Sequence, residues 1–137
     1  MNRLFAAALF AALFASPATA AEREPYGIGL EGFAYPYPVN MLPLVNDGEQ
    51  LRMAYMDIAP AQPNGRTVLL LHGRNFPSSY WAPVIKMLSD AGYRVVVPDQ
   101  IGFGKSSKPQ GDLHFDTLAS NTVALLDHLG ITKADLV

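Results

Sequence analysis

Hydrophobic and polar positions along the chain change their period several times, and each period indicates a kind of element. Residues 41–45 (MLPLV) and 51–58 (LRMAYMDI) flank the turn sequence Asn46-Asp47-Gly48, so the pattern predicts an antiparallel hairpin. The second run places three apolar residues on one face: Leu51, Met53 and Tyr55. Two continuous apolar runs follow, at residues 67–71 (TVLLL) and 93–97 (YRVVV). Such runs are typical of strands that are buried on both faces of a parallel sheet.

Apolar residues at helical spacing predict helices between these strands. Within residues 79–91 the apolar positions recur at i, i+3, i+4 and i+7, with Pro83 in the first turn and Gly92 just past the end. A second helical stripe stops at Gly130 and consists of Phe115, Leu118, Thr122, Leu125 and Leu129. Residues 134–137 (ADLV) begin a third parallel strand. Two βαβ units with right-handed crossovers, behind an antiparallel hairpin, define an α/β fold.

The first residues have the composition of a secretory signal peptide. After a short basic start, residues 4–14 are apolar, and Ala18-Thr19-Ala20 provides a small-x-small cleavage site. The apolar run is shorter than the roughly 20 residues that cross a bilayer. We therefore expect residues 1–20 to be a signal peptide, with no stable membrane anchor after cleavage and a periplasmic or secreted mature protein. Residues 21–40, rich in proline and glycine, are expected to form an extended arm before a partial α/β domain at residues 41–137.

Composition and charge exclude several classes of function. The 137 residues are 50% hydrophobic and 16% charged and include no cysteine, which is typical of a globular domain. A formal net charge of -2 gives no basic stripe, so we expect no nucleic-acid partner. Gly104-Lys105-Ser106 resembles the end of a phosphate-binding loop, but Asp99 stands where that motif needs its first glycine. Residues 102–107 (GFGKSS) resemble a dinucleotide-binding fingerprint, but Ser107 stands where that motif needs its last glycine. The sequence therefore predicts no cofactor and no metal site.

Polar and glycine residues cluster where two of the predicted strands end. His72 and Gly73 directly follow the first buried strand. The loop after the second buried strand, PDQIGFGKSS, provides Asp99, Gly102, Gly104 and Ser106. The carboxyl ends of parallel strands meet at one edge of a sheet, where open α/β folds place their ligands. These residues are therefore predicted to lie together at a candidate site.

Taken together, these segments resemble the α/β-hydrolase superfamily, in particular its branch of esterases, epoxide hydrolases, dehalogenases and prolyl aminopeptidases. The resemblance is carried by VLLLHGRNF, by Tyr80-Trp81, by GYRVVVPDQIGFGKSSKP and by LASNTVALLDHLGITKADLV. It implies hydrolysis of an ester, amide, epoxide or similar bond in a small-molecule substrate. In that family the strand that begins ADLV leads directly into the nucleophile elbow, G-x-S-x-G or a variant with aspartate at its centre. The chain is expected to be the amino-terminal part of such an enzyme, truncated before the elbow.

The resemblance also implies roles for individual residues. The loop after the His-Gly pair supplies a backbone N–H to the oxyanion hole, and Arg74 is favoured over Asn75 as its source. The sequence RNFP departs here from the apolar residue and proline that many relatives have after this pair. The residues with a structural role are His72, Gly73, Asp99, Gly102, Gly104 and Ser106, of which His72 braces its loop and Asp99 accepts hydrogen bonds from the glycine-rich loop. The nucleophile, acid and catalytic histidine are expected after Val137, so the chain alone is predicted to be inactive.

Other functions remain open at this point. A non-catalytic α/β half-domain would bind a partner through its open sheet edge. A small flavodoxin-like binding domain is disfavoured, because the chain opens with an antiparallel hairpin and ends without a covering last helix. A makeshift triad of His72, Asp99 and Ser106 is disfavoured as well.

Overall fold

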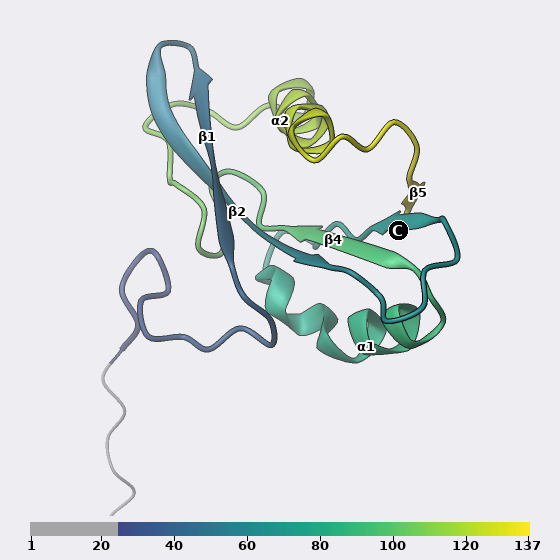
Figure 1. The fold of residues 1–137 in the computed structure, drawn as a ribbon. Coiled ribbons are helices and arrows are strands. Elements are labelled where there is room, and N and C mark those ends of the chain that lie inside the picture. Colours follow the sequence, from purple (N-terminus) through teal and green to yellow (C-terminus); the bar gives the residue numbers. More distant parts are fainter. Residues whose placement is uncertain (1–24) are drawn as a thin grey trace, which may run out of the picture.

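A single mixed sheet organises the described part of the chain, residues 25–137 of a computed structural model; the expected signal peptide lies outside this range. Five strands follow the order β1-β2-β4-β3-β5 (Figure 1). β2 pairs antiparallel with both β1 and β4, whereas β3 runs parallel to both β4 and β5. The strands are β1 (Asn40–Asn46), β2 (Glu49–Ile58), β3 (Thr67–Leu69), β4 (Arg94–Pro98) and β5 (Asp135–Leu136). This pairing confirms the predicted α/β fold.

The hairpin of β1 and β2 forms where the pattern predicts it. Asn46 pairs with Glu49 across a two-residue turn. Asp47 and Gly48 have φ values of 49° and 83°, the left-handed pair that matches the twist of a two-residue hairpin. The predicted inward face is confirmed by one buried core cluster that includes Leu51, Met53 and Tyr55.

Regular pairing of β3 covers two residues fewer than the predicted run at 67–71. The backbone ladder nevertheless continues to the end of that run. The Leu70 N–H donates to the Val96 carbonyl at 2.9 Å, and the Leu71 N–H donates to the Val137 carbonyl at 2.8 Å. The strand therefore extends to the residue that precedes His72.

Helices cover opposite faces of the sheet (Figure 1). The short 3-10 helix η1 (Ser78–Trp81) leads into α1 (Ala82–Asp90), and α2 spans Phe115–His128. Pro83 lies in the first turn of α1, as predicted. Among residues 25–137, no helix is long and apolar enough to cross a membrane. One core lies under α1 and contains Ile85, Val95 and Val97; the other lies under α2 and contains Leu69, Val96 and Leu125.

The apolar stripe of α2 is confirmed except at its first position. Leu125 is fully buried, and Leu118 and Leu129 pack against the same core. Phe115 belongs to α2 as predicted, but its side chain is 90% exposed and does not join the core that the rest of the stripe covers. Because Phe115 is the first residue of α2, it lines a cavity beyond the strand ends instead of covering the sheet.

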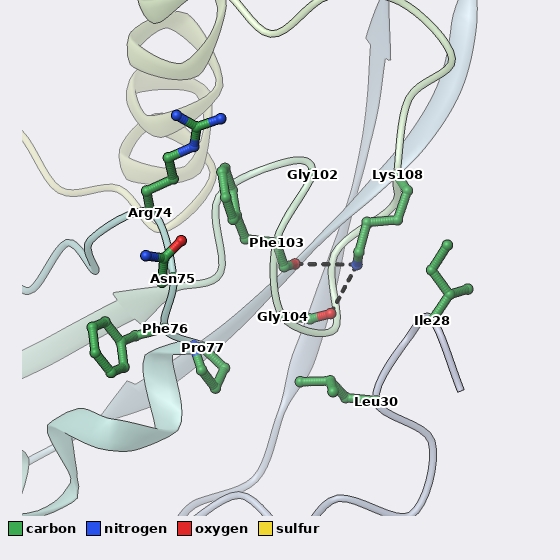
Figure 2. Close-up of a pocket in the computed structure, with 10 residues that line it drawn as sticks. All are labelled: Ile28, Leu30, Arg74, Asn75, Phe76, Pro77, Gly102, Phe103, Gly104 and Lys108. Atoms are coloured by element: carbon green, nitrogen blue, oxygen red, sulfur yellow. Dashed lines mark hydrogen bonds between the residues drawn. The ribbon is translucent and has the colours of Figure 1, made fainter. Parts of the chain in front are cut away.

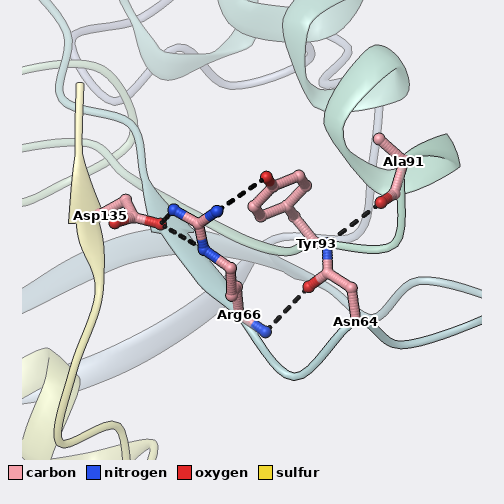
Figure 3. Close-up of polar contacts among 5 residues, drawn as sticks. All are labelled: Asn64, Arg66, Ala91, Tyr93 and Asp135. Atoms are coloured by element: carbon pink, nitrogen blue, oxygen red, sulfur yellow. Dashed lines mark hydrogen bonds and ion pairs between the residues drawn. The ribbon is translucent and has the colours of Figure 1, made fainter.

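A polar cluster fixes the starts of the parallel strands (Figure 3). The Nε and Nη2 atoms of Arg66 donate to Asp135 Oδ2 at 3.1 and 2.6 Å, and Nη1 donates to the Tyr93 hydroxyl at 3.2 Å. The Asn64 amide accepts from the Arg66 N–H and donates to the Ala91 carbonyl. These contacts hold β5 beside β3 at the end of the sheet opposite to the candidate site.

Candidate functional site

The candidate site lies at the carboxyl ends of β3 and β4, where His72 joins the two following loops. Its Nε2 accepts a hydrogen bond from the Gln100 N–H at 2.9 Å, and its Nδ1 lies 2.8 Å from the Gly73 carbonyl oxygen. Because an amide N–H only donates and a carbonyl only accepts, this pairing requires the neutral ring with its hydrogen on Nδ1. Both ring nitrogens are therefore occupied, and in this arrangement His72 has no free nitrogen with which to act as a base.

Asp99 connects three segments that are distant in the sequence. It is fully buried, and its Oδ1 accepts from the Ser78 N–H at 2.7 Å. Its Oδ2 accepts from the Lys105 N–H at 2.7 Å and from the Tyr35 hydroxyl at 2.5 Å. Three donors on one carboxylate compensate for the loss of water around a buried charge. Asp99 thus fixes the start of η1, the glycine-rich loop and the amino-terminal segment to one another.

The Tyr35 hydroxyl is held in its neutral form. Burial, followed by the hydrogen bond to Asp99, raises the pKa of Tyr35 well above its ordinary value. The hydroxyl therefore stays protonated at neutral pH and donates a hydrogen bond to the carboxylate. Nothing in the local pattern of residues 25–39, which form turns and bends without a helix or strand, predicted this contact.

The glycine-rich loop is shaped by Gly104 and Ser106. Gly104 has a φ of 49°, and a Cβ atom there would overlap the carboxylate of Asp99. The buried Ser106 hydroxyl donates to the Asp99 carbonyl at 2.5 Å and accepts from the Ala54 N–H at 2.8 Å. Gly102 also has a positive φ, of 94°. The loop therefore needs small residues, and the hydroxyl of Ser106 is used for backbone contacts.

Lys108 closes the same loop and was not identified from the sequence. Its Nζ donates to the carbonyls of Ser106 at 2.5 Å, Gly104 at 2.8 Å and Phe103 at 3.4 Å, and Figure 2 shows the side chain reaching across the loop. Burial lowers the pKa of Lys108. The sequence signal for this contact is a lysine a few residues after a glycine-rich turn. That signal does not show that the lysine binds the loop carbonyls, because their direction depends on backbone angles that the sequence pattern does not reveal.

The loop after Gly73 carries the predicted oxyanion residues. Arg74 and Asn75 are exposed. Neither backbone N–H donates a hydrogen bond to another residue between 25 and 137. The N–H of the next residue, Phe76, donates to the Gly73 carbonyl at 3.3 Å. A Cβ atom added to Gly73 would meet no atom within 4 Å. The loop therefore presents two N–H groups that the described fold does not use. Their role in an oxyanion hole stays a prediction.

Two cavities border this loop. The smaller, of about 260 Å³, lies between Arg74–Pro77, the glycine-rich loop and the amino-terminal residues Ile28 and Leu30 (Figure 2). The larger, of about 740 Å³, lies between the strand ends and the first turns of α2, and its lining includes His72, Gly73 and Arg74. Its walls are largely apolar, as is common for small-molecule sites.

The structure brings the predicted site residues to one edge of the sheet but does not join them as a catalytic unit. Among the described residues, the side chains of His72, Asp99 and Ser106 form no hydrogen bonds with one another. Each is bonded instead to backbone atoms, or to Tyr35 in the case of Asp99. Residues 25–137 contain no cluster of three or more histidine, aspartate or glutamate side chains placed to hold a metal ion.

Comparison with known families identifies this fold. Residues 66–137 match the family described as alpha/beta hydrolase fold. This part of the chain contains both site loops and the parallel strands. The chain therefore belongs to the α/β-hydrolase family. The antiparallel hairpin, the parallel strands and the loops at their carboxyl ends form one portion of this fold.

Individual relatives agree with this assignment. The haloalkane dehalogenase of Mycolicibacterium paratuberculosis is 35% identical over 105 residues, which cover 74% of this chain and 34% of that protein. Epoxide hydrolase A of Mycobacterium tuberculosis is 36% identical over 90 residues, which cover 64% of this chain and 27% of that protein. The chain thus spans about a quarter to a third of the length of these relatives.

Solved structures give the same result. A probable hydrolytic enzyme of Pseudomonas aeruginosa PAO1 has a TM-score of 0.79 and 52% identity, over 81% of this chain and 36% of that one. A haloalkane dehalogenase of Paraglaciecola agarilytica has a TM-score of 0.65 and 36% identity, over 74% of this chain and 34% of that one. The similarity therefore extends to the arrangement of the strands and helices.

Proposed function

We propose that this chain contributes to an exported hydrolase that cleaves an ester, amide, epoxide, carbon–halogen or similar bond of a small-molecule substrate. The backbone N–H groups of Arg74 and Asn75, which donate no hydrogen bond within residues 25–137, carry the proposal. They follow His72 and Gly73 at the end of β3, where Arg74 lines the larger, largely apolar cavity and Asn75 lines the smaller one. N–H groups held in place before the reaction stabilise the negative charge that develops on a substrate oxygen.

The described loops are braced in the way that such a site requires. His72 joins the loop of Arg74 to the loop of Gln100, and Asp99 joins the glycine-rich loop to the start of η1. A donor placed within a fraction of an ångström of its target needs this support from surrounding residues. We therefore assign His72 and Asp99 a positioning role and not a chemical one.

The remaining catalytic groups are proposed to follow Val137. None of the residues 1–137 lies in a G-x-S-x-G sequence, and the relatives are about three to four times as long as the region they share with this chain. The β5 strand is adjacent to β3, so a nucleophile placed just after β5 would face the Gly73–Asn75 loop. Reading the DNA past codon 137 tests this: an in-frame or frame-shifted G-x-S-x-G, or its aspartate variant, is expected within a few codons.

Export is proposed from the sequence of residues 1–20. Cleavage after Ala20 would leave Ala21 as the mature amino terminus. Amino-terminal sequencing of protein from a periplasmic extract or culture medium is expected to begin at Ala21. Recovery of the intact Met1 terminus on membrane-bound material would contradict the proposal.

Gly73 provides a direct test of the active-site assignment. The protein expressed from the complete reading frame is assayed with p-nitrophenyl butyrate, styrene oxide and 1-bromobutane. Because a Cβ atom at Gly73 would meet no atom of residues 25–137 within 4 Å, Gly73→Ala is expected to leave the melting temperature unchanged. Its methyl group, beside the N–H groups of Arg74 and Asn75, is expected to lower kcat/KM by about tenfold or more. Gly111→Ala, which also meets no atom within 4 Å and lies outside both cavities, is the matched control.

The alternative function, a half-domain that binds a partner through its sheet edge, predicts a different result. It predicts no turnover of any of the three substrates by the complete protein and no effect of Gly73→Ala. The flavodoxin-like alternative does not agree with membership of the α/β-hydrolase family.

A further inference from the structure

Besides its backbone N–H, Arg74 has a charged side chain, and the residue borders both cavities. Figure 2 shows the side chain extending from the loop with Phe103 between it and Lys108, and Arg74 shares the lining of the larger cavity with Leu118 of α2. Within residues 25–137 the guanidinium takes part in no ion pair. The proposed function assigns no role to this group.

The charged side chains that line the two cavities are of one sign. Among the described residues that line the two cavities there is no aspartate and no glutamate, and the charged side chains are Arg74 and Lys108. The three donors of Lys108 are directed at the carbonyls of its own loop. Arg74 is therefore the one cation of this lining whose donors remain available to a ligand.

The cavity walls strengthen the attraction that Arg74 exerts on an anion. Leu71, Phe103, Leu113 and Leu118 line the larger cavity together with Arg74. Apolar walls reduce the effective dielectric constant, and a cleft lined by charge of one sign concentrates ligands of the opposite sign. Elsewhere in the chain, Arg94 binds both carboxylate oxygens of Asp57 at 2.9 and 2.8 Å, which illustrates the two-point contact that a guanidinium makes with a carboxylate.

We propose that the Arg74 side chain is a specificity-determining group that binds a carboxylate on the substrate. This inference depends on the proposed hydrolase function and narrows its substrate class to small molecules that carry a carboxylate near the bond that is cleaved. In this arrangement one residue contributes twice: its N–H faces the reacting oxygen, and its guanidinium holds the anionic end. An apolar chain between these two groups would contact the leucine and phenylalanine walls.

Kinetics on a matched pair of esters test the inference. Mono-p-nitrophenyl succinate and p-nitrophenyl butyrate share a leaving group and differ chiefly in the terminal carboxylate. For the complete enzyme at low salt, we expect kcat/KM to favour the succinate by about tenfold or more, and we expect salt to reduce this preference. The measured quantity is the ratio of the two kcat/KM values, so a change that affects both esters equally cancels.

Variants connect that ratio to Arg74. Arg74→Gln is expected to lower the succinate preference by about tenfold, and Arg74→Lys by less, because an ammonium keeps the charge but loses the two-point contact. Arg52→Gln removes an equal charge from an exposed position on β2 that borders neither cavity, and is expected to leave the ratio unchanged. A wild-type enzyme that prefers the butyrate, or an unchanged ratio in Arg74→Gln, would overturn the inference.

A binding experiment separates this inference from the proposed function. Absence of turnover with both p-nitrophenyl esters, with styrene oxide and with 1-bromobutane would contradict the hydrolase proposal. Calorimetric titration with butyrate and with butyramide then decides whether Arg74 binds carboxylates. We expect butyrate to bind about tenfold more tightly than butyramide and to lose this advantage in Arg74→Gln; equal binding of the two probes would refute the assignment.

Discussion

The Tyr35 hydroxyl donates a hydrogen bond to the buried Asp99 carboxylate at 2.5 Å, across 64 positions of the sequence. The contact ties a segment without regular secondary structure to the central loop of the site. Lys105 adds to it, since its Nζ donates to the Leu30 carbonyl at 2.9 Å and lies 5.0 Å from the centre of the Tyr35 ring. Leu30 and Tyr35 are therefore attached to the loop that shapes the site.

Removal of this hydroxyl is expected to destabilise the protein. Tyr35→Phe keeps the ring but leaves Oδ2 of Asp99 with one donor fewer, which costs about 2 kcal/mol for a hydrogen bond to a charged group. Urea unfolding measures the free energy. Tyr26→Phe is the matched control, because Tyr26 is half-exposed and its hydroxyl donates no hydrogen bond within the described residues. An equal loss in both variants would show that the Tyr35–Asp99 bond is not the cause.

The same contact makes the stability depend on pH in the alkaline range. The pKa of Tyr35 is raised in the folded protein, so the unfolded chain releases this proton first as the pH rises. The contribution of Tyr35 is therefore fully present below the ordinary tyrosine pKa of about 10 and is lost progressively above it. Unfolding at about pH 8 and about pH 11 is expected to show a smaller alkaline loss of stability in Tyr35→Phe than in the wild type. The lowered pKa of Lys108 acts with the opposite sign but is common to both proteins. Equal losses in the two proteins would contradict this prediction.

The sequence predicted the elements of the fold because their signals are local. The hairpin depends on Asp47-Gly48 and on the alternation after it, and the buried strands depend on uninterrupted apolar runs. Those strands in turn place His72 and Asp99 at one edge of the sheet. The sequence did not predict Tyr35, whose partner is distant in the chain, or Lys108, whose acceptors are backbone carbonyls. Phe115 fits the helical period, but periodicity does not show where the covered sheet ends.

Gly104 is expected to tolerate no side chain. Gly104→Ala forces a Cβ atom into the Asp99 carboxylate at a φ of 49°, which combines overpacking with a left-handed backbone and costs about 3 kcal/mol. Gly111→Ala has open space and no positive φ, so its unfolding free energy is expected to stay within about 0.5 kcal/mol of the wild type. Thermal or urea unfolding of the two variants provides the comparison. Similar values for both would mean that the loop adapts around Asp99.

The chain of 137 residues, expressed by itself, is expected to have no hydrolase activity. The contacts within the described site lead to this expectation: Ser106 uses its hydroxyl for two backbone bonds, and His72 uses both ring nitrogens. A nucleophile needs a base within hydrogen-bond distance, and an oxyanion hole without a nucleophile retains only a small part of the acceleration. We expect hydrolysis of p-nitrophenyl acetate and butyrate at the rate of the buffer blank, with His72→Ala as the comparison. Turnover above the blank that disappears in His72→Ala would instead assign His72 a chemical role, and the hydrogen bond from Gln100 would then have to break during catalysis.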